Sequence, residues 1–146
     1  MLRRKIKIDS GRIEIIDRSN DPKGIVREAE QVISVFAKEE IARFFPKLTF
    51  IFVGQKHWKN KRLNDKLVAY IETNKVEKGM YIFYINLSNI LDYSTERGLD
   101  FHKELLNVCK HETAHLYHLT KNNYMLIRKR AIERLVEILE GNKIVI

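Results

Sequence analysis

The segment between Pro22 and Pro46 most constrains how this chain can fold. Apolar side chains recur in it at steps of three and four residues: Ile25, Ala29, Val32, Ile33, Phe36, Ala37, Ile41, Phe44 and Phe45. This spacing places them on one side of an α-helix. Asp21 followed by proline is typical of a helix start, and Pro46 cannot continue a helix. The sequence therefore predicts a long helix over residues 22–46 with one wide buried face.

Alternating apolar residues predict strands on both sides of this helix. Residues 5–17, KIKIDSGRIEIID, alternate around a turn at Asp9-Ser10-Gly11 and predict a hairpin within residues 1–18. Three more strands are predicted at residues 48–54, 66–73 and 80–87, and the last two should form an antiparallel pair. Residues 80–87 fit an exposed sheet edge and an internal core strand equally well. Residues 55–65, QKHWKNKRLND, are predicted to be a polar loop.

Two helices should complete the domain, one from about residue 100 to 121 and one that starts after Asn123 and stops at Gly141. The order of elements predicts an α+β domain, with a small, mainly antiparallel sheet and a long backing helix. We expect residues 1–146 to form one domain. The apolar tail at residues 141–146 should pair with a sheet edge or cover a cleft.

The composition limits the class of protein. Hydrophobic residues make up 45% and charged residues 32% of the 146 residues, which is typical of a globular domain. The longest apolar runs are too short to cross a bilayer, and the basic start MLRRKIKID has no apolar signal-peptide core. Cys109 is the single cysteine and cannot form an internal disulfide. We therefore expect a cytoplasmic protein without a membrane partner.

Residues 110–119, KHETAHLYHL, contain three of the five histidines. His111 and His115 are four residues apart, so on a helix both imidazoles lie on one face, one turn apart. That spacing suits two ligands of a single zinc ion, Zn²⁺. Glu112 stands beside them, where it could take a proton from a water molecule.

The surrounding residues favour a metal site over incidental histidines. An apolar stripe runs along the same predicted helix: Leu105, Val108, Cys109, Leu116 and Leu119. His111 and His115 lie along one edge of this stripe, where they would face a cleft. The alternative is that both histidines sit at the polar edge of a packed helix and bind nothing.

The segment VCKHETAHLY resembles the HExxH signature of the zincin metallopeptidases. The order of a long backing helix, a small sheet and then this helix is also similar to the zincin N-terminal subdomain. The resemblance implies a zinc-dependent peptidase that cleaves a peptide or protein substrate, with Glu112 polarising the attacking water.

A catalytic zinc ion normally takes three protein ligands and leaves one position for water. His118 does not suit the third position. It lies seven residues from His111, which is about 10 Å along a helix axis. No histidine follows His115 at the spacing that metzincins use. An acidic ligand from the next helix is the better candidate.

A short turn near residues 120–123 should make the last two helices an antiparallel pair. Reflecting positions about this turn brings Glu133 level with the two histidines and puts Glu137 one turn further on. Glu133 is therefore favoured over Glu137 as the third ligand, although it could instead be a solvated acid. The segment ERLVE is similar to the glutamate helix of gluzincins, and the short chain is closest to minimal, single-domain gluzincins. Glu137 would then accept a hydrogen bond from a ligating imidazole.

Tyr117 and Tyr124 are candidates to stabilise a developing oxyanion, although either could be a packing residue. Two other functions stay open. The chain could be a latent zincin-like scaffold that binds zinc and acts as a regulator. It could also be a basic module associated with nucleic acid, because its net charge is +8 and QKHWKNKR mixes basic and aromatic residues.

Overall fold

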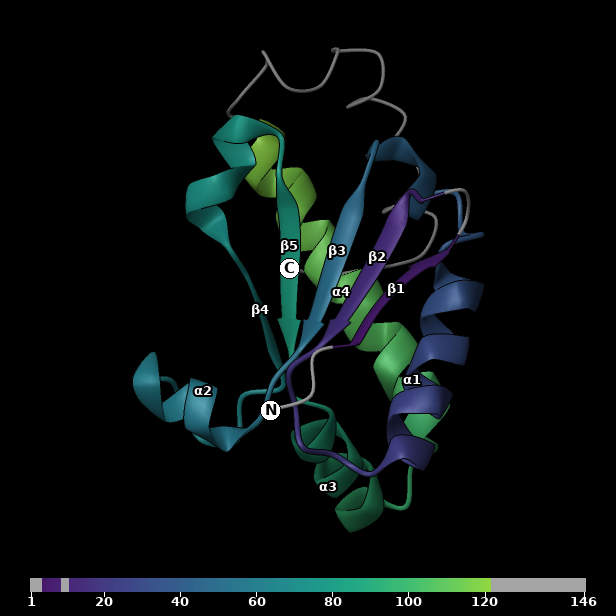
Figure 1. Cartoon of the computed structure of the whole chain (residues 1–146), viewed down its shortest axis with the longest axis vertical. Helices are drawn as coiled ribbons and strands as arrows, with labels where there is room; N and C mark the ends of the chain where they lie inside the picture. Colours follow the sequence, from purple (N-terminus) through teal and green to yellow (C-terminus); the bar gives the residue numbers. More distant parts are fainter. Residues whose placement is uncertain (1–3, 9–10, 122–146) are drawn as a thin grey trace.

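The computed structural model describes residues 4–8 and 11–121, and Figure 1 shows the arrangement of their helices and strands. Five strands form one sheet in the order β1-β2-β3-β5-β4. The strands are β1 (Arg4–Ile8), β2 (Ile13–Asp17), β3 (Leu48–Phe52), β4 (Ala69–Ile71) and β5 (Tyr81–Ile85). The helices are α1 (Lys23–Phe36), α2 (Gln55–Asn60), α3 (Leu87–Arg97) and α4 (Phe101–Lys121), with short 3₁₀ turns at η1 (Ala42–Phe44) and η2 (Thr73–Lys78). The predicted α+β class is confirmed.

The sheet is mixed, whereas the sequence predicted a mainly antiparallel one. The β1–β2 hairpin and the β4–β5 pair are antiparallel as predicted. The three central strands, β2, β3 and β5, run parallel to one another. The physical reason is the crossover: α1 carries the chain from the end of β2 back to the start of β3, so that both strands run the same way. β5 lies between β3 and β4, which makes it the internal strand and leaves β4 at the edge.

The first helix is shorter than predicted. α1 ends at Phe36, whereas the sequence predicted a helix over residues 22–46. The Arg12 guanidinium donates hydrogen bonds to the backbone carbonyls of Ala37, Ala42 and Phe45, at 3.2, 3.1 and 3.0 Å. These carbonyls are therefore turned toward β2, which a continuous helix would not allow. Ile41 and Phe45 are still buried, so the apolar pattern correctly predicted the buried positions beyond the helix end.

The main core lies between one face of the sheet and the helices α1, α3 and α4. Leu48, Phe50 and Phe52 of β3 point into this core, as do alternate residues of β5. The other face carries a smaller core around Trp58 of α2, which packs with Ile51 and Val53. Helices α1 and α2 therefore cover opposite faces of the sheet.

Two helices were missed from the sequence. α2 forms where a polar loop was predicted, and it is held by Trp58, whose Nε1 donates a 2.6 Å hydrogen bond to the Leu67 carbonyl. α3 is capped at its start by Asn86, whose side chain accepts a hydrogen bond from the backbone amide of Asn89 at 3.1 Å, and at its end by Gly98 in a left-handed conformation. This cap and this glycine are standard signals for the two ends of a helix.

The predicted helix after Asn123, its stop at Gly141 and the tail at residues 141–146 lie outside the described residues. The assignment of residues 1–146 to one domain stays a prediction for the same reason. The predicted helix before them is confirmed as α4. It starts where the Asp100 carboxylate accepts a hydrogen bond from the Lys103 amide, at 3.1 Å.

We expect Arg12→Lys to lower the free energy of unfolding by about 2 kcal/mol, because an ammonium group cannot reach the three carbonyls that the guanidinium bonds. Arg27→Lys on the exposed side of α1 is the matched control and should change stability by less than about 0.5 kcal/mol. Urea denaturation followed by circular dichroism measures both. Equal stabilities for the two variants would contradict this role of Arg12.

Candidate metal centre

The helix α4 is fixed by one buried face. It packs against α1, α3, β4 and η2. The residues that it buries are Phe101, Leu105, Cys109, Thr113, Ala114, Leu116, Tyr117 and Thr120. His111 is exposed, and Glu112 and His115 are half-buried. The predicted position of the histidines, along one edge of the apolar stripe, is confirmed.

The structure brings together the three residues of the motif. The Nε2 atoms of His111 and His115 are 2.9 Å apart, which is a hydrogen-bonding distance in which one ring donates to the other. The two rings are nearly perpendicular, at 86°, with centroids 4.5 Å apart. One ligand atom from each of His111, Glu112 and His115 lies within 4.8 Å of the others. Two imidazole nitrogens and a carboxylate oxygen therefore converge on one point of the α4 surface.

This geometry fits a zinc ion with little movement. A tetrahedral ion with Zn–N bonds of about 2.05 Å holds two ligand nitrogens about 3.3 Å apart. The observed separation of 2.9 Å is smaller by a few tenths of an ångström, which a small rotation of either ring supplies. Since an imidazole ligand must be neutral, the charge state of the histidines also matters.

Burial and neighbouring charges favour that neutral state. Burial lowers the pKa of His115, and the nearby His111 and His118 lower it further. Burial also favours the neutral form of Glu112, because it raises the pKa of this carboxyl from an ordinary 4.5 to about 7. The desolvated carboxyl therefore holds a proton up to neutral pH in the absence of a cation.

The structure describes three of the other residues considered in the sequence analysis, and three more lie outside the described residues. Tyr117 is buried in the main core, which is the packing role that the sequence allowed, and its oxyanion role stays a prediction. Cys109 is buried as predicted, and burial raises the pKa of its thiol. His118 is exposed and is not part of the converging group. Glu133, Glu137 and Tyr124 lie outside the described residues.

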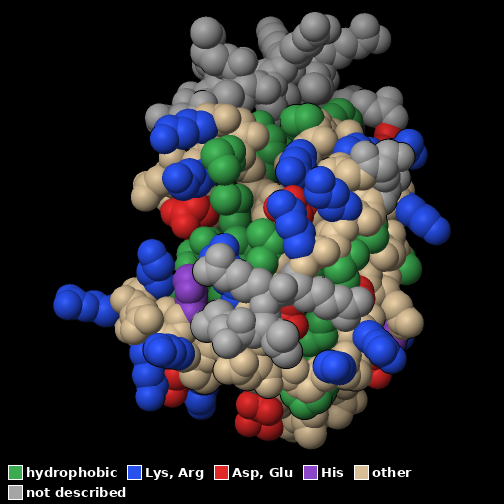
Figure 2. Space-filling model, viewed as in Figure 1, with side chains coloured by type: hydrophobic (Ala, Val, Ile, Leu, Met, Phe, Trp, Pro, Cys, Tyr) green, Lys and Arg blue, Asp and Glu red, His purple; other side chains and the backbone are tan. Residues whose placement is uncertain are grey.

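A cavity of about 440 Å³ at the carboxyl ends of the central strands was missed from the sequence. It contains none of the motif residues and is lined in part by Arg18 and Asp21, after β2, and by Gly54, after β3. Figure 2 shows Lys and Arg side chains gathered over the nearby α2, at the lower left of the face in view. The helix predicted between these two strands was the sequence signal that could have found this cavity. Such a helix favours parallel pairing, which brings the loops after β2 and β3 together.

Comparison of the chain with protein-family models, with curated proteins and with solved structures finds no match. Among the helices in the described part of the chain, none has the length and apolar character needed to cross a membrane. The residues of the candidate sites therefore carry any assignment of function.

We expect the metal-free protein to lose about 2 kcal/mol of stability as the pH rises from 5 to 8, because of Glu112. Its folded pKa of about 7 lies above the ordinary value, so the unfolded chain releases the proton first and gains stability relative to the folded protein as the pH rises. Glu112→Gln should remove this part of the pH dependence. Urea denaturation at both pH values, with a chelator present, measures it.

Glu96→Gln, which changes an exposed acid on α3, is the control and should keep the wild-type pH dependence. If Glu112→Gln also follows the wild-type curve, the carboxyl of Glu112 is not desolvated.

Proposed function

We propose that this protein is a zinc-dependent metallopeptidase whose centre is built on α4. The observation that carries the proposal is the convergence of the His111 and His115 ring nitrogens, 2.9 Å apart, with the Glu112 carboxylate within 4.8 Å. The resemblance of VCKHETAHLY to the zincin signature supports the same assignment. We propose the cytoplasm as its compartment, because a single buried cysteine cannot form an internal disulfide.

Each residue has a separate role in the proposal. His111 and His115 would hold the ion through Nε2, and Glu133 is the proposed third ligand. Glu137 would accept a hydrogen bond from a ligating imidazole and so would fix the orientation of that ring. When bound, zinc supplies Lewis-acid polarisation of water and of the substrate carbonyl.

Glu112 performs the proton transfers. Its carboxylate accepts a proton from the attacking water and then returns it to the leaving amine of the cleaved peptide bond. It lies next to His111 in the sequence, so its reach is fixed by the same helix that carries the ligands. Tyr117 and Tyr124 remain candidates for contact with the developing oxyanion.

We expect the purified protein to bind one zinc ion per chain and His115→Ala to lose most of it. Glu133→Gln should also weaken zinc binding strongly, whereas Glu137→Gln should weaken it by only about 10–100-fold. Competition with a chromophoric chelator measures all three affinities.

His118→Ala is the matched control, because it removes an exposed histidine from the same helix face and should leave the zinc content unchanged. Equal zinc loss in His115→Ala and His118→Ala would contradict the predicted ligand set. Equal effects of Glu133→Gln and Glu137→Gln would contradict the choice of Glu133.

We expect Glu112→Gln to lower the cleavage rate of fluorescent casein by at least about 100-fold while zinc stays bound, since the amide cannot accept the proton. Glu104→Gln, an acid in the first turn of α4, should retain wild-type activity. Zinc binding without any cleavage by the wild-type protein would favour the latent scaffold. If the purified protein binds no zinc, both the peptidase and the latent zinc-binding scaffold are contradicted.

A further inference from the structure

The cavity at the carboxyl ends of the central strands is a second site, separate from the α4 centre. It has a volume of about 440 Å³, within the range of small-molecule sites. The loops after β2 and β3, the helix α2 and the first turn of α3 contribute its lining residues. Figure 1 shows where these elements lie in the fold. Its lining residues are Arg18, Asn20, Asp21, Val53, Gly54, Gln55, Lys56, His57, Asn60 and Ser88.

The topology opens a crevice at this place. After β2 the chain turns to α1 on one face of the sheet, and after β3 it turns to α2 on the opposite face. Adjacent parallel strands whose connections leave in opposite directions form a crevice outside their carboxyl ends, and open α/β sheets bind ligands there. The backbone amide of Arg18 donates to the Phe52 carbonyl at 2.9 Å, so the two strand ends are joined at the base of the crevice.

Two buried polar atoms of this cavity's residues have no hydrogen-bond partner in the described part of the chain. They are Arg18 Nε and Asp21 Oδ2. The other carboxylate oxygen of Asp21 is used, because it accepts a 2.6 Å hydrogen bond from the Ser88 hydroxyl. Both atoms are closed to solvent in this structure, so a ligand in the cavity reaches them only after a small rotation of each side chain. Buried polar groups are normally satisfied, so an unmet donor and an unmet acceptor on two lining residues indicate a ligand that offers both kinds of group.

The walls of the cavity are well fixed. The Asp17 carboxylate accepts hydrogen bonds from the amide and the hydroxyl of Ser19, at 2.9 and 2.6 Å, which orders the loop that carries Arg18 and Asp21. His57 Nε2 lies 2.6 Å from the Tyr70 hydroxyl, and its ring stacks on Tyr84 at a centroid distance of 4.8 Å. A ligand would therefore meet a preorganised site rather than order it on binding.

The charge of the cavity is suited to an anion. Among the described residues that line it, Arg18 and Lys56 are the cations and Asp21 is the acid, with His57 at the wall. Burial lowers the pKa of His57, and the nearby charges of Lys61 and Arg18 lower it further. A planar guanidinium that stays charged at all physiological pH values is well suited to phosphate.

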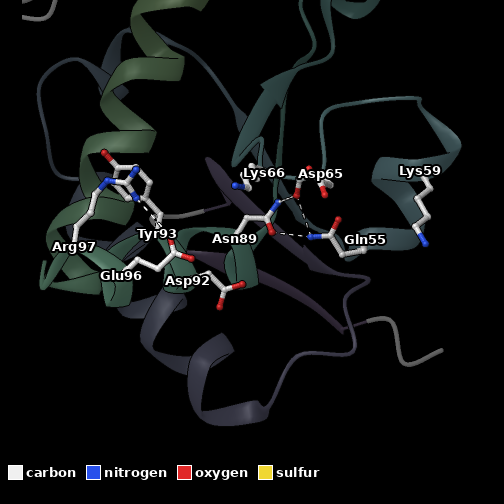
Figure 3. Close-up of a pocket in the computed structure, with 9 residues that line it drawn as sticks. All are labelled: Gln55, Lys59, Asp65, Lys66, Asn89, Asp92, Tyr93, Glu96 and Arg97. Atoms are coloured by element: carbon white, nitrogen blue, oxygen red, sulfur yellow. Dashed lines mark hydrogen bonds and ion pairs between the residues drawn. The ribbon is translucent and has the colours of Figure 1, made fainter.

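A neighbouring cavity of about 640 Å³, which shares Gln55 with the first, does not have these properties (Figure 3). Its lining holds three basic and three acidic side chains. Its most buried side chain, Asn89, donates to the carbonyls of Asp65 and Leu67 and accepts from Gln55, at 2.7–2.8 Å. These bonds hold the loop between α2 and β4, so the Asn89 and Gln55 side chains of this cavity already have a structural use.

We propose that the cavity at the carboxyl ends of β2 and β3 binds a small phosphate monoester that also carries hydroxyl groups, of the size of a nucleoside monophosphate. Arg18 and Lys56 bind the phosphate oxygens. Asp21 Oδ2 accepts a hydrogen bond from a hydroxyl of the ligand, while Ser88 holds the other oxygen. The site is separate from the metal centre, because the described residues of the two sites do not overlap.

The test is calorimetric titration of the full chain with ribose 5-phosphate, AMP, adenosine and inorganic phosphate. We expect one saturable site for the two esters and at least tenfold weaker binding of adenosine, which lacks the phosphate. Arg18→Gln and Lys56→Gln should each weaken ester binding about tenfold or more. Asp21→Asn should weaken the esters but leave inorganic phosphate unchanged.

Lys59→Gln is the matched control, because Lys59 is on α2 but does not line this cavity, and it should bind the esters like the wild type. Lys56 is exposed, so Lys56→Gln keeps the test valid if Arg18→Gln does not fold. The proposal is overturned if neither ester binds, or if Arg18→Gln and Lys56→Gln bind as well as Lys59→Gln. Binding of a single-stranded oligonucleotide without binding of either ester would also overturn it, in favour of an extended nucleic-acid surface.

Discussion

The fixed position of α4 on the sheet is the constraint on which the candidate metal centre depends. Leu105, Cys109 and Leu116 anchor the helix in the main core. Since rotation of the helix would expose these side chains, the edge that carries His111 and His115 has one orientation. Burying such a side chain stabilises a fold by about 1.5–3 kcal/mol relative to leaving it exposed. Hydrophobic packing, rather than the polar residues themselves, therefore determines where the two imidazoles meet.

The local features of the fold were predictable because they depend on short-range patterns. The hairpin, the β4–β5 pair and α4 follow from alternation, from turn residues and from helical spacing. The same is true of His111, Glu112 and His115, because a four-residue step on a helix fixes the distance between two rings. The position of Cys109 in the core followed from the same helical periodicity.

The non-local features were not predicted. The early end of α1 depends on Arg12, which is 25 residues from the nearest carbonyl that it bonds. No local pattern near Phe36 records that contact. The parallel central strands were missed because alternation gives the position of a strand and not its direction, although a helix between two strands favours parallel pairing. The cavity lined by Arg18 and Gly54 was missed for the same reason, because it forms only where the carboxyl ends of β2 and β3 lie side by side.

Trp58 gives the molecule an intrinsic optical reporter. It is the single tryptophan of the chain, it is fully buried, and its indole donates a 2.6 Å hydrogen bond to the Leu67 carbonyl. Its neighbour His57 lines the cavity at the strand ends, whereas the packing of α4 lies on the opposite face of the sheet. Tryptophan emission from the unlabelled protein therefore monitors the environment of α2 specifically, and it reports on the face of the sheet opposite to α4.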